Sequence, residues 1–135
     1  MELDQELRDF VKAKASLELI AMIGEMEEPR HVDLRHRIHV SSSTLTDRLK
    51  TGVQHDIWAQ QLLQEDDGTA KQIYELTQFG ETLYNNLQEY DLPEKYEERR
   101  RLKDTISHAE IEFYNEIGAG PETDEHPPPP DERNY

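Results

Sequence analysis

The sequence contains no cysteine, which excludes disulfides, thiolate metal sites and redox sensing by thiols. It also lacks any apolar run approaching the roughly 18 residues of a membrane span, and it begins without a basic, apolar signal segment. We therefore expect a cytoplasmic protein with no membrane contact. With 34% apolar residues in 135, the chain can form one modest core, so we expect a single domain with appendages.

Groupings typical of enzymes and metal sites are also missing. The sequence has no glycine-rich phosphate loop, no nucleophile motif, and no carboxylate pair that stands out from its 30 acidic residues. Among its six histidines, His31, His36 and His39 lie close in sequence but do not share one helical face. We expect neither an enzyme nor a bound cofactor or metal.

The charge is strongly acidic but unevenly distributed. The whole chain carries −15, yet residues 29–50 contain five basic and two acidic side chains, or +3, which leaves −18 elsewhere. Such a basic island in an acidic chain marks a place where a polyanion could bind. A chance cluster on a solvated face remains the alternative.

The excess of Asp and Glu resembles proteins of salt-loving archaea. In molar salt the Debye length falls to about 3 Å, so repulsion between acidic surfaces and DNA is largely screened. The same salt weakens counterion release, so binding would depend on close contacts, shape and bridging cations between acids and phosphates.

Residues 41–58 predict a helix that could enter a DNA groove. Ser41 follows Val40 and can cap the first turn. The spacing turns Leu45, Leu49 and Gly52 or Val53 inward, and it turns five small, polar or charged residues outward: Ser42, Ser43, Thr46, Asp47 and Lys50. An ordinary surface helix would have the same pattern.

The segments before it complete a helix-turn-helix. Residues 3–14 predict a short amphipathic helix whose apolar residues Leu3, Leu7 and Phe10 could contact the core or a second subunit. A second helix, capped by Ser16 and ended by Pro29, has hardly any polar face. Residues 31–38 then predict a two-turn helix with Val32, Leu34 and Ile38 facing the core, followed by a short turn.

A hairpin and two helices follow. Asp67-Gly68 supplies the positive φ angles of a tight turn between two strands. Thr77 can cap the next helix, whose apolar face is predicted as Phe79, Leu83, Tyr84, Leu87 and Tyr90.

Residues 94–117 predict a long helix with one apolar seam. The seam could be internal to the domain or could pack against a second copy of the chain, and we favour the dimer. The three arginines 99–101 are expected to pair with glutamates of their own helix. The apolar seam of this long helix consists of Leu102, Ile106, Ala109, Phe113 and Ile117.

The last segment, 118–135, is acidic and proline-rich, which predicts disorder.

Two motifs carry a family resemblance. STLTDRLK at 43–50 resembles the recognition-helix core of the HxlR, PadR and MarR groups of transcription regulators. YELTQFGETL at 74–83 resembles the strand-to-helix exit of the same groups. The resemblance covers residues 15–92, and the acidic composition points toward halophilic archaeal members, stress regulators among them.

The fold implied by the resemblance is mainly α with a small β-hairpin wing, a winged helix-turn-helix with N- and C-terminal dimerisation helices. Its parts would be an N-terminal helix at 1–14, the DNA-binding domain at 15–92, a dimerisation helix at 93–117 and a disordered tail at 118–135. The implied partners are a second copy of the chain and double-stranded DNA with a pseudo-palindromic operator.

The resemblance also implies positions for DNA contacts. Groove contacts would fall on Ser42, Ser43, Thr44 and Arg48, with Thr46, Asp47 and Lys50 beside them. From the residue types, Arg30, Arg35, Arg37 and Lys50 are candidate phosphate contacts. The wing departs from the family because its tip is Glu65-Asp66-Asp67-Gly68, with Lys71 as the nearby cation and the candidate DNA contact of the wing. A winged helix that binds a protein instead of DNA, and an acidic scaffold, are the rival interpretations.

Overall fold

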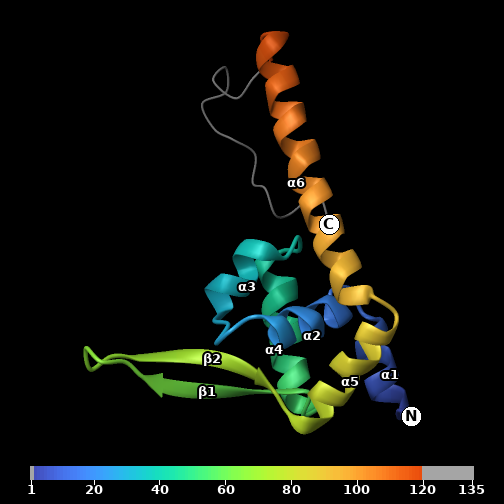
Figure 1. Ribbon diagram of the computed structural model, residues 1–135, viewed down its shortest axis with the longest axis vertical. Coiled ribbons are helices and arrows are strands. Elements are labelled where there is room, and N and C mark those ends of the chain that lie inside the picture. The colour runs from blue at the N-terminus through green and yellow to red at the C-terminus, as the bar shows by residue number, and fades with distance from the viewer. Residues whose placement is uncertain (1, 120–135) are drawn as a thin grey trace.

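The computed structural model describes residues 2–119, and the predicted disorder of the tail therefore falls mostly outside the described residues. The described part is mainly helical, with one antiparallel hairpin (Figure 1). Its elements are, in order, α1 (Gln5–Lys12), α2 (Ser16–Glu25), α3 (His31–Arg37), α4 (Ser42–Gln54), β1 (Trp58–Gln64), β2 (Ala70–Leu76), α5 (Gln78–Glu89) and α6 (Leu92–Glu116). No described helix combines the length and apolarity that crossing a membrane requires.

Helix α2 forms the centre of the core, as its nearly all-apolar sequence predicted. Its residues from Leu19 to Ile23 are all buried, and α1, β2, α5 and α6 pack around it. The predicted cap was wrong, because Ala15 holds the N-cap position with φ 74° and Ser16 is the buried first residue of the helix. The helix also ends earlier than Pro29, since Met26 is already extended.

The helix-turn-helix consists of α3, the turn at 38–41, and α4. Leu34 and Ile38 are buried as predicted, but Val32 is 36% exposed because it lies on the outer side of the short α3. Ser41 caps α4 through its side chain. Helix α4 ends at Gln54 rather than near Trp58, because Asp56 reverses the chain with φ 59°.

Gly52 allows β1 to pack directly under α4. A Cβ atom at this glycine would lie 2.1 Å from the Trp58 ring, a separation that no side chain tolerates. The indole nitrogen of Trp58 donates to the Leu49 carbonyl oxygen at 2.9 Å. The hairpin is thus anchored to α4 at its base.

The hairpin turn is a three-residue loop with a bulge rather than a two-residue turn. The Gly68 amide donates to the Glu65 carbonyl at 3.1 Å, and the Glu65 amide donates to the Thr69 carbonyl at 2.8 Å. Only Gly68 of the Asp67-Gly68 pair has positive φ, at 90°. This geometry is a type I turn followed by a left-handed glycine, so the turn was predicted correctly in place but not in type.

Thr77 caps α5 as predicted, accepting the Gly80 amide at 3.0 Å. Tyr90, placed on the apolar face of this helix from the sequence, is 75% exposed because α5 ends one residue before it. Helix α6 begins at Leu92, before Pro93, since proline is tolerated in a first helical turn where its missing amide costs no hydrogen bond.

Helix α6 packs against the body along its first half, as far as Asp104, whose Oδ1 lies 3.1 Å from His39 Nε2. It then projects away from the body (Figure 1). The predicted intrahelical pairing of the three arginines holds only for Arg101, whose guanidinium lies 3.7 Å from Glu97. Arg99 and Arg100 instead both bind the buried carboxylate of Glu18 on α2. These ion pairs join the first half of α6 to α2.

Candidate nucleic-acid interface

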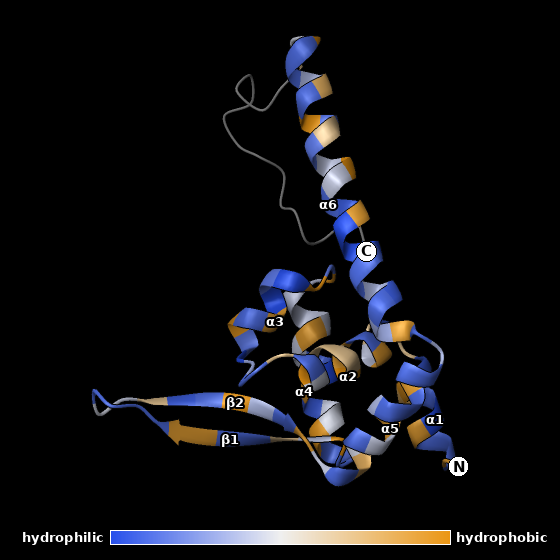
Figure 2. Cartoon of the chain, viewed as in Figure 1, coloured by the Kyte–Doolittle hydropathy of each residue, from blue (hydrophilic) through white to orange (hydrophobic). Residues whose placement is uncertain are grey.

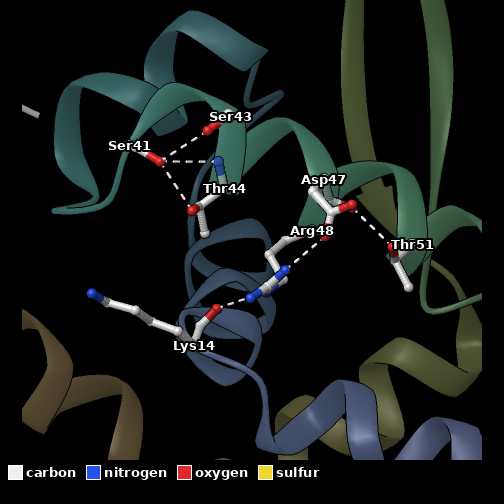
Figure 3. Close-up of polar contacts among 7 residues, drawn as sticks. All are labelled: Lys14, Ser41, Ser43, Thr44, Asp47, Arg48 and Thr51. Atoms are coloured by element: carbon white, nitrogen blue, oxygen red, sulfur yellow. Dashed lines mark hydrogen bonds and ion pairs between the residues drawn. The ribbon is translucent and has the colours of Figure 1, made fainter. Parts of the chain in front are cut away.

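The start of α4 is held by a small hydroxyl network (Figure 3). Ser41 Oγ accepts the Thr44 amide at 3.1 Å and donates to Thr44 Oγ1 at 3.0 Å. Ser43 Oγ lies 3.2 Å from the same Ser41 oxygen. The Thr44 hydroxyl is therefore engaged within the turn and half-buried, whereas Ser43 remains exposed and can reach a ligand.

The outward face of α4 is close to the prediction. Thr46, Asp47 and Lys50 are exposed, and Ser42 is half-buried at the rim. Among the described residues Lys50 forms no ion pair, so its ammonium group is available to an anion. This face combines short hydroxyls with one cation, a composition that suits close approach to a DNA groove.

Arg48 does not present its guanidinium on that face. Its Nε donates to the Lys14 carbonyl oxygen at 2.8 Å, and its Nη1 lies 2.7 Å from Asp47 Oδ2 (Figure 3). The side chain is only 21% exposed. The groove contact that the resemblance implied for Arg48 is thus not prepared here. Arg48 lies three residues after the buried Leu45, and this position on α4 turns its side chain toward the α1–α2 connection.

Helix α3 and its N-cap residue carry further cations. Arg35 and Arg37 are exposed and form no ion pair within residues 2–119. Arg30 is partly occupied, since Asp33 Oδ2 accepts its backbone amide at 2.9 Å and lies 3.5 Å from its Nε. The hydrogen bond from that amide holds the pKa of the Asp33 carboxyl below its ordinary value.

The wing carries little free positive charge. Lys71 Nζ lies 2.8 Å from Glu28 and 4.0 Å from Glu65, and the hydrogen bond to Glu28 raises the pKa of the lysine. The exposed tip adds Asp66 and Asp67, the latter with a pKa lowered by hydrogen bonds from Thr69. Lys71, predicted as a DNA contact, is therefore neutralised by acids of its own chain.

A groove of about 230 Å³ separates α4 from the hairpin. His31 lines this groove, and its Nε2 lies 3.2 Å from Thr46 Oγ1. Gln60, whose amide donates to the Tyr74 hydroxyl at 3.0 Å, lines the same groove. The sequence prediction missed these residues. The helical spacing from Lys50 could have found Gln54, but Gln60 reaches the groove only because the hairpin folds back under α4.

The residues assigned to a dimer contact divide into two groups. Those on α6 are exposed: Leu102 by 60%, Ile106 by 48%, Phe113 by 56% and Ile117 by 58%, with Ala109 exposed as well. Figure 2 shows apolar residues along the projecting part of this helix. Phe10, by contrast, is 5% exposed and packs against Trp58 in the core of the subunit. Leu3, which precedes α1, and Leu7 on α1 are half-buried, so these two of the three predicted N-terminal residues retain surface for a partner.

Comparison with known proteins agrees with this geometry. The family model described as HxlR-like helix-turn-helix matches residues 11–101. No curated protein sequence matches the chain. Among solved structures, the chain resembles the reduced form of the transcriptional regulator YodB from B. subtilis at 26% identity. The TM-score is 0.54, with 67% of this chain and 88% of that one covered.

A second similar structure is that of a possible HxlR family transcriptional factor from Thermoplasma volcanium. It is 19% identical with a TM-score of 0.54, and the match covers 80% of this chain and 86% of that one. At this identity the likeness concerns the fold alone. The family match spans more than half of the chain and includes α2, α3, α4, the hairpin and α5. The chain belongs to the HxlR-like family of winged helix-turn-helix transcription regulators.

Proposed function

We propose that the protein binds DNA sequence-specifically as a homodimer on a pseudo-palindromic operator and regulates transcription by occupying it. The observation that carries the proposal is the exposed face of α4, which presents Ser43, Thr46 and Lys50. Arg35 and Arg37 of α3 are exposed as well and form no ion pair in the described part of the chain. Hydroxyls on α4 would read base edges, while the cations would bind phosphates and set the register.

Contacts from the wing would be weak or indirect in this protein. The acids at the hairpin tip repel phosphate, and the ammonium group of Lys71 is bound to Glu28. In a high-salt cytoplasm, which the acidic composition supports, cations held between these acids and the phosphates could bridge the two. The groove beside α4 would then contribute more to recognition than the hairpin tip.

The dimer would form along α6. Four large apolar side chains on this helix are about half-exposed, and isolated subunits rarely leave such a stripe uncovered. Two copies packed through this stripe would hold two α4 helices on one side of the assembly. A two-fold axis between them predicts an operator whose half-sites are inverted repeats.

The test compares two kinds of variant by fluorescence anisotropy on operator and scrambled duplexes across potassium chloride concentrations. Arg35→Gln with Arg37→Gln removes four cations per dimer, so binding to every duplex should weaken and the salt slope should fall by roughly 3 to 4. Thr46→Ala should reduce the preference for operator over scrambled DNA instead.

Lys95→Gln is the matched control, because Lys95 is an exposed cation on α6 paired with Glu98. It should leave the salt slope and the preference for operator over scrambled DNA unchanged. If the arginine and threonine variants also bind like the parent protein, α3 and α4 do not contact DNA. A protein partner for this face would then be the better interpretation.

A further inference from the structure

Asp47 lies at the centre of the outward face of α4. A helix has about 3.6 residues per turn, so Asp47 points almost directly away from the buried Leu45 and Leu49. Its side chain is 65% exposed. The proposed function places this face in a DNA groove, where a carboxylate approaches a polyanion. An acid at such a position needs a cation that offsets its charge.

The offsetting cation is Arg48, the next residue of the same helix. Consecutive residues of a helix point about 100° apart and do not face each other. Arg48 Nη1 nevertheless donates to Asp47 Oδ2 at 2.7 Å (Figure 3). The Arg48 side chain is only 21% exposed, so it reaches the carboxylate from the core side and leaves the outward face open. With that charge offset, Lys50 leaves the outward face with a positive charge.

The Arg48 guanidinium is itself held in place from another part of the chain. Its Nε donates to the Lys14 carbonyl oxygen at 2.8 Å, in the connection between α1 and α2 (Figure 3). A guanidinium is planar, so donating through Nε to one acceptor and through Nη1 to another fixes its orientation. The Asp47 carboxylate bound to it is therefore held in one orientation as well.

One oxygen of the Asp47 carboxylate is available to a ligand. An ionised carboxylate accepts hydrogen bonds through both oxygens. Oδ2 binds Arg48, whereas Oδ1 forms no hydrogen bond to any residue that the structure describes. Ser43 and Thr46 on the same face have short side chains, which let α4 approach base edges closely. The short side chain of an aspartate needs such a close approach to reach a base.

We propose that Asp47 recognises a cytosine in each half-site of the operator and that Arg48 is the residue that positions it. Asp47 Oδ1 accepts a hydrogen bond from the amino group of the cytosine, a major-groove donor that suits a carboxylate. This assignment rests on the proposed function and adds to it one base and the residue that recognises that base.

The other three bases fit this carboxylate less well. Guanine presents two acceptors in the major groove, and thymine presents an acceptor and a methyl group, so neither donates to Asp47. Adenine has an amino group, but its N7 acceptor lies beside that group and repels the negative charge. Cytosine offers its amino group without a neighbouring acceptor on the same base.

The test measures base preference at single positions of the operator. The full chain first selects a motif from random duplexes in high potassium chloride. Fluorescence anisotropy then gives its affinity for duplexes that carry each base pair at each position. One position of the half-site should prefer cytosine by about tenfold, the effect of a single mismatched base pair. Asp47→Asn should remove this preference and raise the affinity for adenine there, because an amide pairs with adenine N6 and N7.

Asp91→Asn is the matched control for the lost acidic charge. Asp91 is exposed between α5 and α6 and has φ 56°, a left-handed conformation that asparagine also adopts. This variant should leave the base preference at every position as in the parent protein.

Arg48→Met tests the positioning role, because it removes the guanidinium and keeps an unbranched stem. It should lower the cytosine preference in the parent protein and have no further effect on that preference in the Asp47→Asn variant. Arg48→Lys keeps the charge but cannot donate in two fixed directions, so it should cause a smaller loss of the same preference. Urea unfolding of each variant confirms that it is folded.

Three results contradict the inference in different ways. A selected motif whose base preferences are unchanged by Asp47→Asn overturns the role of Asp47 and leaves the proposed function standing. A loss that Arg48→Met causes equally at all positions, or equally with and without Asp47, overturns the positioning role of Arg48. If the parent protein selects no motif at all, the proposed function fails and this inference fails with it.

Discussion

Replacing Glu18 by glutamine tests the buried ion pair that joins α2 to α6. The side chains of Glu18 and Arg100 are each only 8% exposed, whereas that of Arg99 is 57% exposed. The substitution leaves the Arg100 guanidinium buried without a counter-charge. Removing one partner of such a pair costs about 3–5 kcal/mol. We expect the lower end, about 3 kcal/mol, since glutamine keeps one hydrogen-bond acceptor.

Two further variants separate burial from charge. Glu97→Gln breaks the exposed pair with Arg101, whose side chains are 47% and 70% exposed, and should cost about 0.3–0.5 kcal/mol. Combining Glu18→Leu with Arg100→Met removes both buried charges. This double variant should recover to within about 1 kcal/mol of the parent protein, because no unpaired charge remains in the core.

Urea unfolding followed by circular dichroism provides the free energies. All variants are compared at one protein concentration, since the stability of a dimer depends on concentration. The free energy of unfolding of a domain of this size is about 5–15 kcal/mol, so a loss of about 3 kcal/mol shifts the urea midpoint measurably. If Glu18→Gln is as stable as Glu97→Gln, the pair does not hold α6 as described.

Three more predictions concern other parts of the fold. Gly52→Ala places a methyl group 2.1 Å from the Trp58 ring and should destabilise by about 3 kcal/mol in urea unfolding; a change below 0.5 kcal/mol, on the order of a surface substitution, would contradict this packing. Because folding lowers the pKa of Asp33, its contribution is present above the ordinary value of 3.8 and is lost as pH falls through the lowered pKa. The stability difference between the parent protein and Asp33→Asn should accordingly disappear in acid, and a difference constant with pH would refute this. Ile106→Lys should convert the proposed dimer to monomer in sedimentation without changing the helix content, and a dimer that persists in this variant would exclude the α6 stripe as the interface.

The sequence was most informative where capping and periodicity act locally. Ser41 and Thr77 cap their helices because a side-chain oxygen one residue before a helix can reach the third amide. The inward positions Leu45 and Leu49 followed from helical spacing alone. The order of elements, and with it the winged helix-turn-helix, was therefore predictable.

Long-range contacts were not predictable in the same way. Helical spacing placed Arg48 at the boundary between the core face and the solvent face of its helix, so it did not predict where the side chain points. In the structure the Arg48 guanidinium points toward the Lys14 carbonyl oxygen, which accepts its hydrogen bond. The pairing of Glu18 with two arginines about 80 residues later depends on where α6 crosses α2. Glutamates of the same helix offered equally good local partners, so no sequence pattern distinguished the two outcomes.

The exposure and charge of the candidate site residues were predicted best on α4 and least well on the wing. Thr46 and Lys50 are exposed because their helical positions face away from Leu45 and Leu49. Lys71 was the single cation near the hairpin tip, and its partner Glu28 comes from the segment before α3. Glu28 lies near Lys71 because the Tyr74 amide donates a hydrogen bond to the Pro29 carbonyl oxygen, a tertiary contact that joins β2 to the segment before α3.

Selection from a pool of random DNA duplexes, carried out with the full chain in high potassium chloride, tests the central claim most directly. The account predicts enrichment of an inverted repeat whose half-site centres lie about one helical turn, or a multiple of it, apart. It also predicts that Thr46→Ala combined with Lys50→Gln reduces the enrichment. A pool that stays random, or an enriched motif that this double variant leaves unchanged, would contradict the assignment of α4 as the recognition helix.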